Sequence, residues 1–337
     1  MTYRVIQWAT GNVGRLAIEG VEAHPELELV GVWVHSPEKA GKEFGGVTAT
    51  NDVDEILAMD ADCVIYTPML GQTEEVARIL RSQKNVVTPV GWFYPKDTTG
   101  IAELEGACRE GGVTLHGTGI HPGGITERFP LTLSALCTNI RHVKAEEFSD
   151  IRNYQAELVV REIMLFGKPP EEAAKSAMLD ILGSGFSQSV RMVADELGLQ
   201  LDDELQTGHE WAVATKDLDT PVGLIAKGTV AAQRFTWQGT VNGEPRVTAR
   251  VNWLMGEDLD PPWKLGGERF EVSFDADPPL HVVFHGLHPE VVGDDLDRNR
   301  GLLATANNCV NSVPYVCDAE PGVKTYLDLP MIAGRAV

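Results

Sequence analysis

Hydrophobic and polar positions alternate along the first 120 residues in blocks that predict strands and helices in turn. Short apolar and β-branched segments predict strands at 3–9, 27–35, 62–68, 85–89 and 113–117. Segments with helical spacing predict helices at 12–23, 52–58, 73–83 and 99–110. Strands separated by helices need parallel crossovers, which build a sheet with helices on both faces. We therefore predict a first domain, residues 1–130, with an α/β fold built on a doubly wound parallel sheet.

The pattern changes after about residue 125. Helical spacing predicts helices at 125–137, 154–166, 171–181 and 187–197, with a strand at 140–149. Residues 210–284 are mostly β, with stretches at 223–237, 245–254, 268–274 and 280–284. Long strands in a row indicate a mixed or antiparallel sheet, so residues 131–297 are predicted to form an α+β domain. A helix at 298–316 and an extended tail at 321–330 are predicted to complete the chain.

Composition narrows the classes of function. Asp and Glu number 49 against 28 Lys and Arg, a formal charge of −21 in 337 residues. Nucleic acid and anionic membrane surfaces select clustered Lys and Arg, so neither is expected as a partner. No apolar run approaches the roughly 18 residues of a membrane span, and residues 1–7 have a strand pattern instead of a signal-peptide pattern. We therefore expect a cytoplasmic protein.

The cysteines predict neither a disulfide framework nor a structural metal site. Five of them, an odd number, are widely spaced along the chain, and no Cys-x-x-Cys pair occurs. Secreted scaffolds and zinc sites need paired or closely spaced cysteines. No metal is expected.

The segment between the first strand and the first helix is a candidate dinucleotide site. A helix that begins directly after a glycine turn offers unpaired N–H groups and a partial positive charge to a pyrophosphate. Gly11 would allow the tight turn, and Gly14 would let the helix approach the strand. The alternative is a turn whose glycines serve packing alone. The predicted cofactor-binding residues here are Thr10, Gly11, Asn12, Val13, Gly14 and Arg15.

The end of the second strand bears on the choice between the two nicotinamide cofactors. An Asp or Glu there would bind the ribose 2′-hydroxyl of NAD and repel a 2′-phosphate. This chain instead has His35, Ser36 and, shortly after, Lys39. Ser36 can donate to a phosphate oxygen and Lys39 supplies positive charge, so we predict NADP, with NAD tolerated. The alternative is that Lys39 and Lys42 are solvated loop charges.

Three further segments follow predicted strands of the parallel sheet. In an open parallel sheet the ligand lies outside the carboxyl ends of the strands. We therefore expect residues 67–69, 88–92 and 117–124 to surround the nicotinamide and the reacting carbon. The predicted cofactor-binding residues in them are Thr67, Pro68, Thr88, Gly119 and Pro122.

Several motifs together resemble one family. They are ATGNVGR, HSPEK, GTGIHPGG, EEFSDIRNYQAE, FGKPPEE and TANNCVNSVPYVCDAEPGVKTYLDLP. These motifs are similar to those of the 2,4-diaminopentanoate dehydrogenases and related bacterial amine dehydrogenases, whose N-terminal domain resembles that of dihydrodipicolinate reductase. The resemblance covers essentially the whole chain. It implies a Rossmann domain, an α+β domain that binds substrate and forms a dimer, and a segment, residues 298–337, that returns to the Rossmann domain. It also implies hydride transfer between NAD(P)H and a carbonyl or imine carbon.

One loop departs from the resemblance. The family's amine dehydrogenases place a Glu after the strand that corresponds to residues 85–89, where it orients ammonia or the amine. Here residues 90–96 read VGWFYPK, without a carboxylate. The substrate would then be a ketone or alcohol, unless another acid has taken that place. Trp92 and Tyr94, with Phe93 between them, are predicted to line an apolar substrate pocket; the alternative is that they belong to the core.

Hydride transfer to a carbonyl needs a hydrogen-bond or proton donor near the developing alkoxide. The candidate catalytic residues are His121, which follows the Gly-Thr-Gly segment, and Tyr154 and Asn153, which lie in the second domain. Thr305 and Asn308 are predicted to reach the substrate pocket from the C-terminal helix. The alternative for all of them is a structural role in packing and capping.

The predicted function is an NAD(P)H-dependent oxidoreductase that transfers hydride to a ketone or imine carbon of a largely apolar, small-molecule carbonyl or amine substrate. Three alternatives remain: an alcohol dehydrogenase or ketone reductase that does not use ammonia, a cyclic-imine reductase of the dihydrodipicolinate type, and a cofactor sensor without catalysis. A homodimer is expected from the resemblance and from the long strands between residues 223 and 284.

Overall fold

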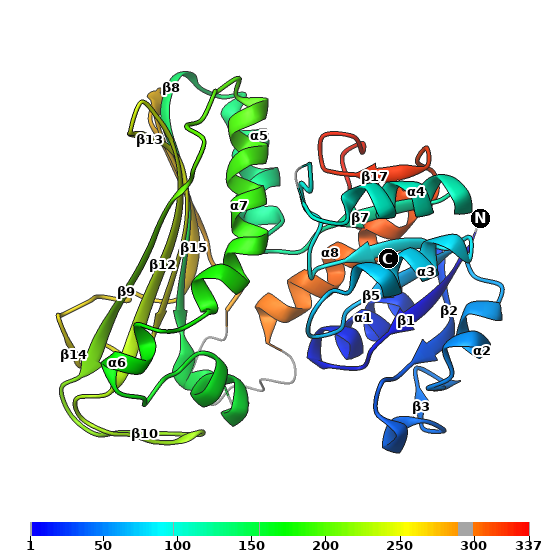
Figure 1. Ribbon diagram of the computed structural model, residues 1–337, viewed down its shortest axis with the longest axis horizontal. Coiled ribbons are helices and arrows are strands. Elements are labelled where there is room, and N and C mark those ends of the chain that lie inside the picture. Colours follow the sequence, from blue (N-terminus) through cyan, green and yellow to red (C-terminus); the bar gives the residue numbers. More distant parts are fainter. Residues whose placement is uncertain (1, 97, 155, 289–298, 337) are drawn as a thin grey trace. The chain divides into compact units, whose positions relative to one another are not determined.

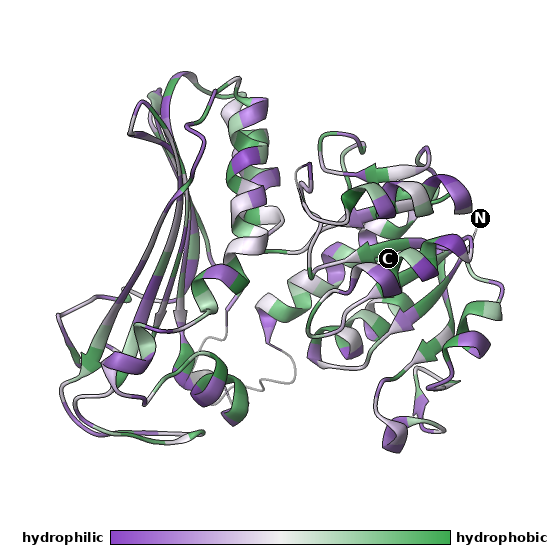
Figure 2. Ribbon diagram, in the orientation of Figure 1, coloured by the Kyte–Doolittle hydropathy of each residue, from purple (hydrophilic) through white to green (hydrophobic). Residues whose placement is uncertain are grey.

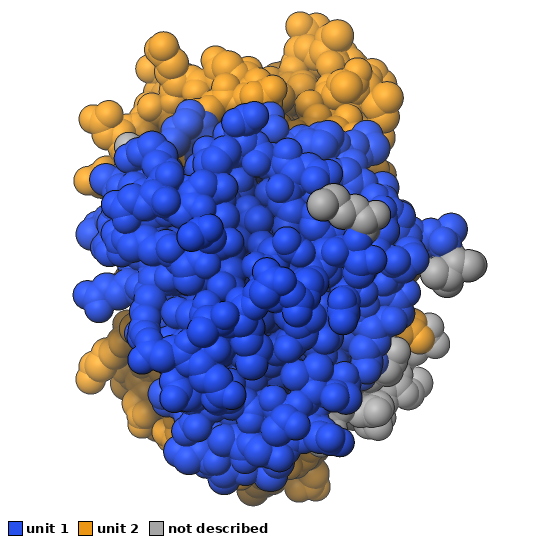
Figure 3. Space-filling view, turned by 90° about the vertical axis from the view of Figure 1, so that its right-hand side faces the viewer, with its two compact units in different colours: residues 1–124, 301–337 blue, residues 125–300 orange. Residues whose placement is uncertain are grey.

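The structure is a computed structural model that describes residues 2–96, 98–154, 156–288 and 299–336. Its internal contacts divide the chain into two compact units, shown in different colours in Figure 3. Unit 1 contains residues 1–124 and 301–337, and unit 2 contains residues 125–300. None of the helices in the described ranges combines the length and the apolar composition that a bilayer crossing requires.

Unit 1 is built on a six-stranded parallel sheet of order β17-β7-β6-β5-β1-β2 (Figure 1). This confirms the predicted α/β fold with a parallel sheet. The last strand in sequence, β17, occupies one edge beside β7 and therefore completes the sheet from the far end of the chain. The strands are β1 (Tyr3–Trp8), β2 (Leu27–Trp33), β5 (Cys63–Tyr66), β6 (Asn85–Thr88), β7 (Thr114–Gly117) and β17 (Gly322–Lys324), and a small hairpin pairs β3 (Glu43–Phe44) with β4 (Val47–Thr48).

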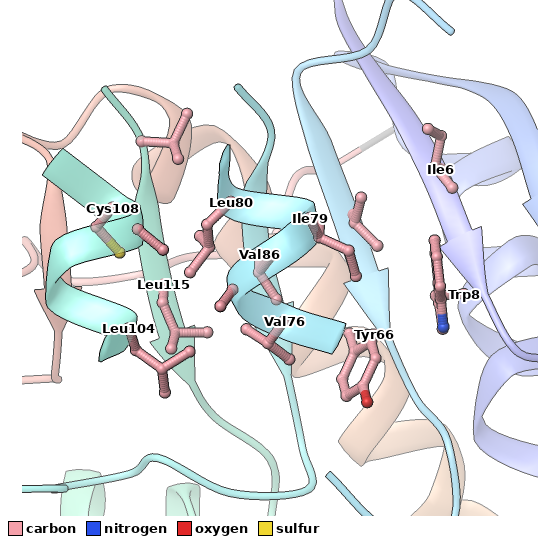
Figure 4. Packing of buried hydrophobic residues seen from close by; sticks show 14 of the residues in the cluster. Ile6, Trp8, Tyr66, Val76, Ile79, Leu80, Val86, Leu104, Cys108 and Leu115 are labelled. Atoms are coloured by element: carbon pink, nitrogen blue, oxygen red, sulfur yellow. The ribbon is translucent and has the colours of Figure 1, made fainter. Parts of the chain in front are cut away.

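Helices cover both faces of this sheet, which explains why its strands are hydrophobic at consecutive positions. One face of the sheet packs against α2, α3 and α4; Figure 4 shows Val76, Ile79 and Leu80 of α3 and Leu104 of α4 around the strands. The other face packs against α1 and α8. The helices of the unit are α1 (Asn12–Ala23), α2 (Val53–Ala58), α3 (Thr73–Arg81), α4 (Ile101–Gly111) and α8 (Arg300–Cys317).

Unit 2 contains a seven-stranded mixed sheet of order β14-β9-β12-β13-β8-β15-β16, which confirms the predicted mixed-sheet domain. Only the pair β13–β8 is parallel within this described sheet. The strands are β8 (Thr138–Asp150), β9 (Gln206–Ala214), β12 (Val230–Val241), β13 (Glu244–Leu254), β14 (Leu259–Asp260), β15 (Arg269–Asp277) and β16 (Leu280–Phe284), and a separate hairpin pairs β10 (Leu218–Thr220) with β11 (Gly223–Ile225).

The long helix α7 (Met178–Glu196) covers one face of this sheet. Hydrophilic and hydrophobic residues alternate along α7 (Figure 2), as expected for a helix with one apolar face. Its Phe186 stacks on Trp237 of β12, with ring centroids 4.6 Å apart. Gly183 lies over the same indole, where a Cβ atom would come within 2.8 Å of Nε1 of Trp237. The shorter helices of the unit are α5 (Phe129–Ser134) and α6 (Pro170–Ala173).

Four of the predicted elements in unit 2 differ from the structure. The helix predicted at 154–166 is shortened to residues 157–163, of which Val159–Ile163 form a π-helical turn, and its β-branched residues do not favour a longer helix. The helix predicted at 171–181 is interrupted, because the Ser176 hydroxyl accepts the Met178 N–H and starts α7 anew. The helix predicted at 125–137 is shortened to a π-helical turn followed by α5. The stretch predicted at 223–237 is divided between β11 and β12 by a turn at Gly228, where φ is 84°.

Candidate functional site

The carboxyl ends of the parallel strands in unit 1 carry most of the predicted site residues. β1 ends at Trp8, and α1 begins at Asn12 after three intervening residues. Gly11 takes the N-cap position in an extended conformation, and no side chain caps the helix. The first turn contains no acidic residue, so its unpaired N–H groups and partial positive charge are available to an anion.

The two glycines of this turn have different surroundings. A Cβ atom on Gly14 would lie 2.2 Å from the carbonyl oxygen of Ala9 and 2.9 Å from Oγ1 of Thr67. A Cβ atom on Gly11 would meet no atom within 4 Å. Gly14 therefore permits the close approach of α1 to the sheet, whereas Gly11 leaves open space beside the helix N-terminus. These residues fit a dinucleotide, whose diphosphate needs such an approach to backbone N–H groups.

Lys39 folds toward this turn. Its Nζ lies 3.3 Å from Oγ1 and 3.4 Å from the carbonyl oxygen of Thr10, which is itself buried. Ser36 instead hydrogen-bonds to the exposed carboxylate of Glu38. The backbone N–H of Glu38, and then the Ser36 hydroxyl, lower the pKa of that carboxyl. The loop after β2 therefore directs the Lys39 ammonium group toward the glycine turn. It also places the Glu38 carboxylate beside Ser36, which is predicted to donate a hydrogen bond to a phosphate, and His35 is exposed next to them.

The hydroxyls at the ends of β5 and β6 are used within unit 1. Thr67 accepts a hydrogen bond from Nε2 of Gln7 at 2.8 Å and donates to the carbonyl of Trp8 at 3.1 Å. The fully buried Thr88 donates to the carbonyl of Tyr66 at 2.8 Å. These bonds hold adjacent strand ends together, and Pro68 follows, half-buried. Contacts of Thr67, Pro68 and Thr88 with a cofactor stay a prediction.

The C-terminal helix and tail hold the Gly117–Gly124 segment. Nδ2 of Asn308 on α8 donates to the carbonyl of Gly119 at 2.5 Å, and the hydroxyls of Thr118 and Tyr326 are 2.5 Å apart. Gly119 has a φ of 153°, and the methyl group of Thr305 lies 3.8 Å from where its Cβ would be. The predicted residues Gly119, Thr305 and Asn308 are thus brought together in unit 1. The peptide bond between His121 and Pro122, in the same segment, is cis, and both residues are half-buried.

Tyr326 is a residue of this segment that sequence reasoning missed. Its hydroxyl also lies 3.4 Å from Nδ2 of Asn308, and its ring meets His116 edge-on with centroids 5.3 Å apart. The tail was predicted only as an extended segment. The signal available in the sequence is the tyrosine of the segment KTYLDLP, which follows an asparagine-rich helix.

The aromatic residues after β6 are buried. Trp92 and Tyr94 are 7% and 6% exposed, and Trp92 belongs to the core cluster that contains β1, β5 and α3. Its ring lies against Gly71, where a Cβ would come within 2.9 Å. The ammonium group of Lys96 lies 4.5 Å from the centroid of the Tyr94 ring. Contact of Trp92 and Tyr94 with a substrate stays a prediction.

Unit 2 contains the remaining candidates. Tyr154 is half-buried, and burial, followed by the charge of Glu147, raises the pKa of its phenol. The side chain of Asn153 lies outside the described residues. Oε1 of Glu147 accepts hydrogen bonds from the Ser149 hydroxyl at 2.6 Å and from the indole N–H of Trp253 at 3.0 Å.

A parallel sheet with a glycine turn that opens an uncapped helix defines the class of Rossmann-type dehydrogenases. The chain is 32% identical to an amine dehydrogenase of Streptomyces virginiae over a 352-residue alignment that covers 97% of this chain and 96% of the relative. It therefore belongs to the amine dehydrogenase family, as the resemblance predicted.

Other known proteins that are similar to this chain are also dehydrogenases of this kind. Residues 125–255 match the 2,4-diaminopentanoate dehydrogenase C-terminal domain. The 2,4-diaminopentanoate dehydrogenase of Acetoanaerobium sticklandii is 26% identical over 231 residues, 68% of this chain and 61% of the relative. The solved structure of an amine dehydrogenase from Mycobacterium smegmatis shares the fold, with a TM-score of 0.77 and 19% identity over 99% of this chain and 98% of that one. The protein is a dehydrogenase of the class that uses a nicotinamide cofactor.

Proposed function

We propose that this dehydrogenase interconverts a ketone and a primary amine on a small, largely apolar substrate. In the direction of amine synthesis, ketone, ammonium and NAD(P)H give amine, NAD(P)+ and water, which balances in atoms and charge. The uncapped N-terminus of α1, open beside Gly11, is the observation that carries the proposal. The membership in the amine dehydrogenase family supports the substrate class.

The nicotinamide, when bound, supplies or accepts the hydride. The residues of this chain would do the rest. The N–H groups of the first turn of α1 would bind the diphosphate, with Thr10 and Arg15 beside them. Gly119, held by Asn308 and near Thr305, would let the backbone approach the ring.

Two side chains are proposed to act on the substrate oxygen or nitrogen. His121 belongs to the segment after β7, and Tyr154 has a phenol whose raised pKa keeps it protonated as a donor. We expect His121→Ala and Tyr154→Phe each to lower turnover while binding of the cofactor persists. Unchanged turnover in both variants would contradict these roles.

NADP is proposed as the preferred cofactor, with NAD tolerated. The direction of Lys39 toward the glycine turn supports a phosphate contact, whereas the carboxylate of Glu38 beside Ser36 opposes one. The ratio of kcat/KM with NADPH to kcat/KM with NADH tests this preference. A strong advantage for NADH would remove the phosphate role of Lys39 and Ser36.

A second candidate function is ketone reduction without ammonia. Residues 90–96 supply no carboxylate to hold an ammonium ion, and this favours it. A panel of ketones with NAD(P)H, followed by absorbance with and without ammonium chloride, separates the candidates. Turnover that requires ammonium supports the amine dehydrogenase, and turnover that ignores it supports the ketone reductase. Cofactor binding without any turnover would identify a sensor.

We also propose a homodimer, on the basis of the long strands of the unit 2 sheet. Light scattering tests it, because one chain has a mass of 36.7 kDa. A particle of that mass would contradict the dimer.

A further inference from the structure

Two of the five cysteines lie side by side in unit 1, although they are far apart in the sequence. Cys63 is the first residue of β5, and Cys317 is the last residue of α8. Sγ of Cys317 lies 4.0 Å from the carbonyl oxygen of Asp62, the residue before Cys63, and the two thiols are hydrogen-bonded to one another. Both side chains contribute to the cluster in which α1 and α8 pack against the parallel sheet. The start of β5 and the end of α8 thus bring two sulfur atoms into contact.

The two thiols differ in their access to solvent. Cys63 is fully buried, whereas Cys317 is half-buried. Burial, followed by the hydrogen bond with Cys317, raises the pKa of the Cys63 thiol, so that Cys63 stays protonated. A small reagent in solution therefore meets Cys317 first, and Cys63 can react only with a sulfur atom that is already beside it.

The pair lies at the amino ends of the parallel strands, whereas the proposed cofactor site lies at their carboxyl ends. Asp318, next to Cys317, accepts a hydrogen bond at 2.7 Å from the hydroxyl of Tyr3, the first residue of β1. The same helix extends to the other edge of the sheet, where Asn308 binds the carbonyl of Gly119. A covalent bond at the amino ends would therefore fasten the end of α8 to the sheet and leave the residues predicted to bind the cofactor in place.

The charges around Cys317 bear on the kind of oxidant that can reach it. Asp62 and Asp318 are both exposed, and the whole chain has a formal charge of −21. Negative charge repels an anionic disulfide such as oxidised glutathione but does not oppose the approach of a neutral peroxide. Because negative charge also disfavours the thiolate, we expect oxidation to need sustained exposure to the peroxide.

We propose that Cys317 and Cys63 form a reversible disulfide when the protein meets a peroxide, and that this bond fastens α8 to β5. The Cys317 thiolate attacks one oxygen of hydrogen peroxide, the O–O bond breaks, and Cys317 becomes a sulfenic acid while the other oxygen leaves as water. The sulfur of Cys63 then attacks the sulfur of Cys317, the S–O bond breaks, and the departing hydroxide takes the thiol proton to give a second water. Two thiols are oxidised and one peroxide is reduced, so that atoms and electrons balance. A dithiol reductant restores both thiols by exchange.

Two other cysteines provide comparisons. Cys309 on α8 is fully buried in the same cluster, and burial raises the pKa of its thiol, so that it is protected from a solute. Cys137 is half-buried like Cys317, but it is the one cysteine in unit 2, and its Sγ lies 3.5 Å from the carbonyl oxygen of Pro278. Oxidation of Cys137 should therefore give no disulfide within unit 2. Cys137→Ser provides a background in which Cys317 is the half-buried thiol that remains.

Peroxide treatment of Cys137→Ser tests the assignment. The protein is incubated with millimolar hydrogen peroxide, denatured for a count of free thiols, and digested without a reductant for mass spectrometry. We expect the count to fall from four to two, with a linked pair of peptides that contains Cys63 and Cys317. Adding Cys317→Ser should keep the count at its starting value of three. Oxidation of Cys137→Ser should raise the thermal midpoint by about 5 °C or more, reversibly with dithiothreitol, since the bond closes a loop of about 250 residues.

Cys63→Ala in the same background tests the order of the two steps. Without its partner, Cys317 should accumulate as the sulfenic acid, and dimedone should label it much more strongly than in Cys137→Ser alone. Where Cys63→Ala does not fold, the comparison with Cys317→Ser decides alone. The assignment is overturned by the absence of the linked peptides, by a cross-link between two chains on a non-reducing gel, or by an equal loss of thiols in Cys317→Ser. A thermal midpoint that oxidation leaves unchanged also overturns it.

Discussion

Two glycines three residues apart in the first turn of α1 have separable physical tasks. Gly14 faces the carbonyl of Ala9, where a methyl group would overlap it, whereas Gly11 faces open space. We therefore expect packing of the helix to depend on Gly14, and access of a diphosphate to the helix N-terminus to depend on Gly11.

A pair of alanine variants tests this division. Gly14→Ala should lower the thermal midpoint of the protein without cofactor, since the overlap forces α1 away from the sheet. Gly11→Ala should leave that midpoint nearly unchanged, because φ at Gly11 is −71°, but should weaken NADPH binding about tenfold or more by obstructing the diphosphate. Thermal unfolding and fluorescence titration measure the two effects. Loss of stability in Gly11→Ala with normal cofactor affinity would contradict the division.

The predictability of single residues depended on whether their task is local. Gly11 and Gly14 were predictable because a glycine turn between a strand and a helix is a local pattern. The surroundings of Glu147 were not, because they follow from the register of β8 with β13 and β15, two strands that are distant from it in sequence. Adjacent carboxylates at 146 and 147 look alike in the sequence, and only the pairing of strands shows that they point to opposite faces.

We expect the buried His116 to make the free energy of unfolding depend on pH. Burial lowers the pKa of His116 to about 4, below the roughly 6.5 of an exposed histidine. Above pH 6.5 neither state is protonated. As pH falls from 6.5 toward 4 the unfolded chain binds a proton that the folded chain does not, so the free energy of unfolding decreases, by at most about 1.4 kcal/mol per pH unit.

We therefore expect His116→Gln to lose less stability than wild type between pH 7.5 and pH 5. Thermal midpoints at the two pH values measure the difference. His288 in unit 2, whose pKa burial also lowers to about 4, is present in both proteins and cancels in the comparison. An identical pH dependence in wild type and variant would show that His116 does not contribute.

β17 and α8 act together on one loop. β17 pairs with β7, Nδ1 of His116 on β7 hydrogen-bonds the carbonyl of Lys324 at 2.8 Å, and Asn308 of α8 holds Gly119. The segment after β7 is thereby fixed by two elements that arrive from the end of the chain.

Asn308→Ala tests this arrangement. The Gly119 carbonyl would keep the Gly124 N–H at 2.9 Å but lose the amide donor from α8, which costs about 0.5–1.5 kcal/mol. We expect a lower thermal midpoint and weaker NADPH binding, because the loop that follows β7 loses its anchor. Asn311→Ala on the same helix is the control. Wild-type affinity for NADPH in Asn308→Ala would show that this bond does not shape the cofactor site.

Elements of unit 1 were predictable because consecutive apolar positions identify strands that are covered on both faces. Elements of unit 2 were less so. Helices are predicted at 171–181 and 187–197, whereas the structure has the short α6 and then a continuous α7. The interruption before α7 depends on one hydrogen bond, from the N–H of Met178 to the hydroxyl of Ser176. The short strands β3, β4, β10 and β14 contain two or three residues each, too few to show a periodicity.

The chain leaves unit 1 at Gly124 and re-enters it at Gly301. The returning segment is part of the core, since α8 packs with α1 against the parallel sheet. Gly20 of α1 allows this contact, because a Cβ there would lie 3.0 Å from a methyl group of Val310. Unit 1 is therefore complete only with both ends of the chain, and a substitution that destabilises α8 should lower the stability of unit 1.

Val313→Ala tests that coupling. Val313 is fully buried on α8, and removing two methyl groups should cost roughly 2 kcal/mol at about 0.8 kcal/mol per group plus a cavity term. NADPH at 100 times its dissociation constant would return about 2.7 kcal/mol to the unit that binds it. We therefore expect Val313→Ala to lower the midpoint of one thermal unfolding transition, and NADPH to raise that midpoint again. Val283 is 36% exposed on β16 of unit 2, so Val283→Ala should leave the midpoint of that transition unchanged. A midpoint that Val313→Ala lowers but NADPH does not raise would mean that α8 does not stabilise the unit that binds the cofactor.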